Sequence, residues 1–111
     1  MNMQVSQTIL EQLGGRRFIA MTGAKRFVGG NNTLSFKLPS TPHYVAKGIN
    51  GVRITLNPSD TYTVSFFKSR GHNQPTLVEE HSEIYNDMLQ DVFTMVTGLQ
   101  TSLGTMRAVR S

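Results

Sequence analysis

The chain has 111 residues and contains no cysteine. This absence excludes disulfide bonds, thiolate nucleophiles and zinc sites built on cysteine. No apolar run is long enough to span a bilayer, and residues 1–15 lack the basic start and apolar core of a signal peptide. We therefore expect a cytoplasmic protein with no membrane partner.

Acidic residues are few, and most of them fall in one segment. Residues 79–91 hold five of the seven Asp and Glu residues and no Lys or Arg, so all 11 basic residues lie elsewhere. The net charge of the chain is +4. A basic body with one acidic segment indicates an anionic partner, although charge alone also serves solubility.

Catalytic motifs are also scarce. The chain has no Gly-x-Ser-x-Gly elbow, and residues 23–30 resemble a phosphate-binding loop without having its order of glycine, lysine and hydroxyl residues. One acidic cluster with a histidine lacks any recognised zinc spacing and is more simply interpreted as solvated. Its members are Glu79, Glu80, His81 and Glu83. We expect a protein that is not an enzyme, with no catalytic residues, no metal and no cofactor.

Three segments alternate in the same sense, which predicts strands with one buried and one wet side. Their apolar positions are Leu34, Phe36, Leu38, Val52, Ile54, Leu56, Tyr62, Val64 and Phe66. The opposite side gathers polar and basic residues into an open surface. Its members are Ser35, Lys37, Arg53, Thr55, Asn57, Thr61, Thr63 and Ser65.

Turn and helix signals complete the predicted order of elements. We expect a helix at 6–13, a strand at 16–28 bent at Gly23, a turn at 29–32, an edge strand at 44–49, a hairpin dipeptide at Asn50-Gly51, a turn at 57–60, a strand at 76–78, and a helix at 83–98 capped by Ser82. The fold class is therefore α+β. We expect a two-layer sandwich in which a four- or five-stranded antiparallel meander carries a short N-terminal and a longer C-terminal helix on one face. The length suits one domain over residues 1–111, with 1–4 and 102–111 flexible.

The basic residues favour nucleic-acid binding, because several of them can share the open sheet face or its rim. The candidates are Arg16, Arg17, Lys25, Arg26, Lys37, Arg53, Lys68 and Arg70, with Phe67 placed to stack on a base. Each basic residue taken singly is more simply interpreted as a solvated surface charge. The aromatic signature of RNA-recognition sheets is missing, and an acidic run replaces the basic cluster of double-stranded-RNA-binding domains.

Protein binding is the alternative, because an open polar sheet face and an edge strand can dock a partner or a second copy. A homo-oligomer is therefore left open. The sequence does not separate DNA from RNA, nor a binding face from a merely solvated one.

Residues 7–15 (QTILEQLGG), 18–25 (FIAMTGAK) and 34–39 (LSFKLP), with Asp60-Thr61-Tyr62 and residues 92–98 (VFTMVTG), carry a family resemblance. They resemble a group of small uncharacterised proteins from phages and other mobile elements. The resemblance spans roughly residues 7–103 and implies a mobile-element setting. In that setting we expect a non-enzymatic protein that binds nucleic acid through the sheet face and residues 16–26. The alternative is an inhibitor or adaptor that binds a host protein.

Overall fold

The computed structural model describes residues 4–39, 46–69 and 74–99. In chain order the elements are α1 (Gln4–Leu13), α2 (Arg16–Thr22), β1 (Lys25–Gly29), β2 (Thr33–Lys37), the 3-10 helix η1 (Ala46–Gly48), β3 (Gly51–Leu56), β4 (Tyr62–Lys68), β5 (Thr76–Ile84), the 3-10 helix η2 (Asn86–Met88) and α3 (Leu89–Thr97). Of the segments expected to be flexible, residues 1–3 and 102–111 lie outside the described ranges, and Gln4 is the first residue of α1. None of the helices in these ranges is long and apolar enough to cross a bilayer.

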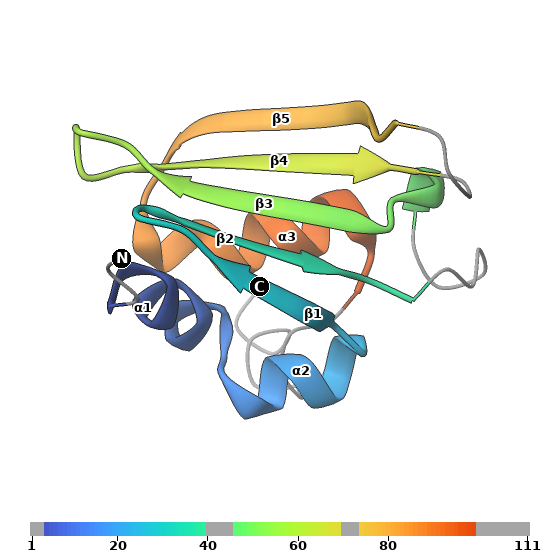
Figure 1. Cartoon of the computed structure of the whole chain (residues 1–111), viewed down its shortest axis with the longest axis horizontal. Helices are drawn as coiled ribbons and strands as arrows, with labels where there is room; N and C mark the ends of the chain where they lie inside the picture. Colours follow the sequence, from blue (N-terminus) through green and yellow to red (C-terminus); the bar gives the residue numbers. More distant parts are fainter. Residues whose placement is uncertain (1–3, 40–45, 70–73, 100–111) are drawn as a thin grey trace, which may run out of the picture.

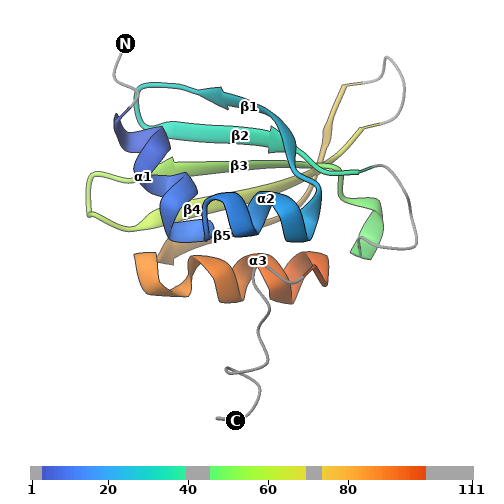
Figure 2. The same cartoon turned by 90° about the horizontal axis from the view of Figure 1, so that it is seen from below.

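Strands β1 to β5 pair in chain order as one antiparallel sheet. The helices α1, α2 and α3 lie on one side of this sheet, and the described residues place no helix on the other side (Figures 1 and 2). Each central strand has one apolar and one polar face, so a single layer of helices is enough to bury the apolar face of the sheet. The predicted α+β two-layer sandwich is confirmed, with five strands in the described part of the chain.

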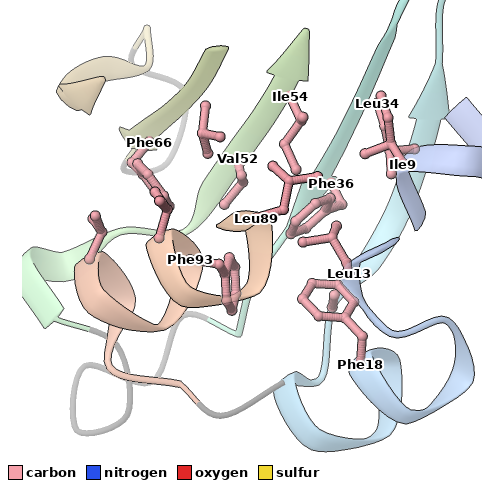
Figure 3. Packing of buried hydrophobic residues seen from close by; sticks show 14 of the residues in the cluster. Ile9, Leu13, Phe18, Leu34, Phe36, Val52, Ile54, Phe66, Leu89 and Phe93 are labelled. Carbon is pink, nitrogen blue, oxygen red and sulfur yellow. The ribbon is translucent and has the colours of Figure 1, made fainter. Parts of the chain in front are cut away.

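The core lies between the sheet and the helical layer, and aromatic rings occupy its centre (Figure 3). Phe18 of α2 packs edge-on against Phe36 of β2 and Phe93 of α3, with ring centroids 5.4 and 5.1 Å away. None of the three rings is more than 2% exposed. Because Leu34 and Phe36 point into this core, the alternate residues of β2 must point away from it.

Residues 16–22 form helix α2, so the strand expected over 16–28 is wrong except for its last residues. Phe18 and Thr22, one helical turn apart, are both buried on the same side of α2. Gly23 ends the helix at φ 74°, and its N–H donates to the carbonyl of Ile19. Ala, Met and Arg favour a helix, and the short apolar run there does not distinguish a helix from a strand.

Residues 79–84 belong to β5, so the helix expected at 83–98 begins later, at Leu89, and Ser82 is not its cap. The expected strand at 76–78 is only the first part of β5. Strand β5 is an edge strand, and most of its side chains are exposed or half-exposed on both faces. It therefore shows no apolar alternation, and its acidic residues resemble the first turn of a helix.

The turn predicted at 57–60 joins β3 to β4, and its ends are closed by hydrogen bonds from Asn57 N–H to Thr61 O and from Asp60 N–H to Asn57 O. The turn predicted at 29–32 joins β1 to β2, where Gly30 N–H donates to Thr33 O. Both turns are confirmed. They fix the direction of the strands that carry the open face.

Asn50-Gly51 does not form a hairpin turn, because Gly51 is already the first residue of β3. The Asn50 side chain instead holds the end of β4. Its Nδ2 donates to the Ser69 carbonyl at 2.8 Å, and its Oδ1 accepts from Ser69 N–H at 3.0 Å. In the expected edge strand at 44–49, residues 44–45 lie outside the described ranges, and Ala46–Gly48 form η1 instead.

Candidate functional site

The side of the sheet that faces away from the helices, called the outer face below, carries side chains in transverse rows set by the strand register. The first row is Lys25, Lys37, Gly51, Phe67 and Leu77. The second row is Val28, Ser35, Arg53, Ser65 and Glu80. The third row contains Thr33, Thr55 and Thr63, with Ser82 of β5 within 3.5 Å of Thr63. Cationic and aromatic groups thus gather at one end of the face and hydroxyl groups at the other.

A hollow of about 220 Å³ opens on the outer face at the first two rows. Its floor includes Gly51, which has no side chain to fill the space between Lys37 and Phe67. A Cβ built on Gly51 would lie 3.6 Å from Phe67 Cβ and 4.0 Å from Lys37 Nζ. Around this floor the hollow is lined by Arg26, Val28, Lys37, Arg53, Phe67 and Pro75.

Arg53 and Phe67 form one unit at the edge of this hollow. The guanidinium carbon of Arg53 lies 4.9 Å from the centre of the Phe67 ring. The two residues are diagonal neighbours on β3 and β4, a spacing that long side chains bridge. A cation over an aromatic face at this distance is attracted to the ring and keeps its own donors free for another ligand.

The cations around the hollow have no carboxylate partner. Within the described ranges, none of Lys25, Arg26, Lys37 and Arg53 takes part in an ion pair. Lys25 and Lys37 stand directly opposite each other on β1 and β2, an arrangement of like charges that destabilises an antiparallel pair. The face therefore holds uncompensated positive charge that an anion would neutralise.

The positive region ends at β4. Ser65 Oγ donates a hydrogen bond of 2.7 Å to Glu80 Oε2 on β5, and Ser65 itself is buried beneath its neighbours. Next to this pair, Leu77 of the first row is half-exposed. The outer face is therefore basic over β1 to β3 and carries a carboxylate on β5, which repels phosphate there.

The opposite face of β5 carries a separate charged cluster, in which Lys47 and His81 both contact the carboxylate of Glu79. Lys47 Nζ binds Oε1, and His81 Nε2 lies 2.7 Å from Oε2. The hydrogen bond from Lys47, and then that from His81, lowers the pKa of Glu79 below its ordinary value. The Glu79 side chain is 27% exposed, so water screens this cluster.

Replacing Glu79 with Gln should remove part of the dependence of stability on pH. A carboxyl whose folded-state pKa is lowered stabilises the fold above its ordinary pKa of 4.5, and this contribution is lost as the pH falls below that value. Urea denaturation of the native protein and Glu79→Gln, from about pH 7 to pH 3, measures the difference in unfolding free energy. We expect the native protein to be more stable than Glu79→Gln at neutral pH, and this difference to shrink below pH 4.5. A difference that is the same at every pH contradicts the assignment.

The metal cluster considered from the sequence is divided by the sheet. The register places Glu80 opposite Ser65 on the outer face, whereas Glu79 and His81 stand opposite Phe66 and Val64, whose side chains point into the core. Within the described ranges, no group of three His, Asp or Glu side chains is arranged to hold a metal ion.

The structure brings together five of the sequence candidates, Lys25, Arg26, Lys37, Arg53 and Phe67, on the outer face. It separates Arg16 and Arg17 from them, because α2 belongs to the helical layer (Figure 2). Lys68 lies against Gly48 of η1, where a Cβ on Gly48 would be 3.0 Å from Lys68 Cδ. Arg70 lies outside the described ranges.

Sequence reasoning missed Gly51 and Val28, which shape the hollow, and it placed Thr61 on the wet side of the sheet. Thr61 is instead buried, and its hydroxyl is hydrogen-bonded by Asn57 and Ser59 in the turn before β4. A glycine inside a strand is a signal of close approach by another group, and this signal was available at Gly51.

Comparison of the chain with protein-family models, with curated proteins and with solved structures finds no match. The function must therefore be argued from the geometry and charge of the site itself.

Proposed function

We propose that the protein is a non-enzymatic nucleic-acid-binding protein and that the outer face is its binding surface. The observation that carries this proposal is the gathering of Arg26, Lys37 and Arg53 around one hollow, with Lys25 opposite Lys37, and none of the four has an ion-pair partner in the described ranges. Side chains of this kind hold phosphate oxygens, and each contact releases a counterion from the nucleic acid.

The aromatic ring at the same place favours a nucleic acid over other polyanions. Phe67 stands beside the cations and lines the hollow with them. Proteins that bind nucleic acid on a sheet combine basic side chains, which follow the backbone, with aromatic side chains on which bases stack. A simple anion would need only the charges.

The distribution of charge on the outer face indicates where the nucleic-acid strand crosses the sheet. The carboxylate of Glu80 on β5 repels phosphate, whereas β1, β2 and β3 present cations. We therefore place the phosphate backbone over β1 to β3, with the bases directed toward Phe67 on β4. Arg16 and Arg17 lie in the helical layer and have no part in this path.

Fluorescence anisotropy of labelled single- and double-stranded DNA and RNA, titrated with the protein at low and at physiological salt, tests the proposal. We expect binding at low salt that weakens steeply as salt is raised, because phosphate contacts dominate the affinity. Absence of binding to all four forms at low salt contradicts the proposal. The search would then turn to a protein partner, such as a host factor bound by an inhibitor or adaptor.

A further inference from the structure

The floor of the hollow is unusual for a strand in the interior of a sheet. Gly51 is paired on both sides, with Lys37 of β2 and Phe67 of β4, and both of these neighbours carry long side chains. Glycine weakens a strand because it has nothing to pack and loses much freedom on folding. Its φ is not in the left-handed region, so the backbone here does not require glycine. The missing side chain instead lets the ends of two neighbours close over the strand: Phe67 Cβ and Lys37 Nζ lie 3.6 and 4.0 Å from where a Cβ would stand, and Gly51 lines the hollow beneath them.

The walls of this space suit a flat apolar group. Phe67, Val28 and Pro75 supply apolar surface, and Val28 is 63% exposed. The basic residues Arg26, Lys37 and Arg53 also line the hollow. An aromatic ring joined to a sugar that has a phosphate on each side matches this combination of apolar walls and basic residues.

We propose that the hollow over Gly51 holds one unpaired nucleobase against Phe67, so that the outer face selects single-stranded nucleic acid over duplex. This inference rests on the proposed function and adds the form of the ligand. In a duplex the faces of the bases are covered by their neighbours, so only an unstacked base can enter the hollow. A duplex can therefore make only the phosphate contacts, whereas a single strand also gains the stacked base.

The floor also implies tolerance of base identity. Strand β3 pairs with β2 and β4, so its backbone donors and acceptors are used within the sheet. The Asn50 side chain at the edge of the hollow is engaged with Ser69 through both its oxygen and its nitrogen. The backbone and Asn50 are therefore not available to read a base edge, and stacking on Phe67 accepts any base.

The test is to fill the hollow with a side chain that the fold accepts. Gly51→Val places a Cβ at ordinary contact distance from Phe67 Cβ and from the flexible end of Lys37. Valine is favoured in strands, so this variant should fold, and Gly51→Ala is the smaller second variant. Thr55→Val, on the same strand and face but in the third row, is the matched control.

Affinity is measured by anisotropy for a labelled oligothymidylate and for a DNA duplex, and thermal denaturation monitors the fold. For Gly51→Val we expect about a tenfold loss of affinity for the single strand, the scale of one stacked base, with duplex affinity unchanged. Thr55→Val should bind both forms as the native protein does.

The outcomes separate this inference from the function on which it rests. Native protein that binds neither form at low salt overturns the proposed function and the inference with it. Native protein that binds both forms equally, together with a folded Gly51→Val that keeps its single-strand affinity, overturns the base site alone and leaves the phosphate-binding face.

Discussion

Reversing the charges of Lys37 and Arg53 together should abolish nucleic-acid binding at physiological salt while leaving the protein folded. Both side chains line the hollow and neither has a carboxylate partner in the described ranges. Each lost phosphate contact reduces the slope of log affinity against log salt by about 0.7 for a single strand, so the double variant should lose roughly 1.4. Anisotropy titrations across a salt series measure both effects.

The fold should survive this change because neither charge reversal removes a strongly stabilising contact. Lys37→Glu places a carboxylate opposite Lys25, which turns a repulsive cross-strand pair into an attractive one. Arg53→Glu removes only the contact with the Phe67 ring, worth about 0.5–1 kcal/mol at an exposed site. Circular dichroism and urea denaturation check the fold.

The matched control is the double variant Arg16→Glu, Arg17→Glu. It changes the net charge by the same amount, but its residues lie on α2 in the helical layer. We expect it to keep the salt slope of the native protein. An equal loss of binding in both double variants would mean that net charge, not the outer face, holds the nucleic acid.

Replacing Phe93 with Ala should destabilise the protein by about 3–5 kcal/mol, which is a large part of the stability of a domain of this size. The ring is fully buried and packs against Phe18 at 5.1 Å and Phe36 at 6.3 Å between centroids, so its removal leaves a cavity in the centre of the core. Urea denaturation followed by circular dichroism measures the change.

Met95 on the same helix provides the control for this prediction, because its side chain is 66% exposed. Met95→Ala should change the unfolding free energy by no more than about 0.5 kcal/mol. A Phe93→Ala variant that loses less than about 1 kcal/mol would contradict the packing of α3 onto the sheet through this ring.

The composition of the outer face could be predicted because alternation is a local property of a strand. The outward direction of Lys37 and Arg53 follows from the burial of their sequence neighbours, Phe36 and Ile54. The same reasoning correctly placed Phe67 on that face. The fold class followed as well, since one-sided strands need only one helical layer.

The hollow could not be predicted, because it depends on register. Lys37, Gly51 and Phe67 are neighbours only because three separate strands align them. Register is set by turns and by the whole buried pattern, and no short window of sequence contains it. The strand expected at Arg16 and Arg17 was wrong for a related reason: whether a short apolar segment becomes helix or strand depends on its tertiary surroundings.

The acidic segment shows another feature that the sequence alone did not predict, namely an edge strand. In sequence its carboxylates resemble the start of a helix, but Glu79 and Glu80 lie on opposite faces of an edge strand. The apolar residues of this largely exposed edge strand, Leu77, Val78 and Ile84, do not alternate with polar ones, so its pattern has no period of two. Its place beside β4 nevertheless matters, since Glu80 limits the positive region of the outer face.

The central claim is that the outer face, and not the helical layer, holds nucleic acid. Amide chemical-shift mapping by NMR, with labelled protein and an unlabelled oligothymidylate at low salt, tests it most directly. We predict that the largest chemical-shift changes are those of the Lys37, Gly51, Arg53 and Phe67 amides. The amide signals of α2 and α3 should not shift. Shifts that gather on α2 or α3, or on no part of the sheet, would contradict the account.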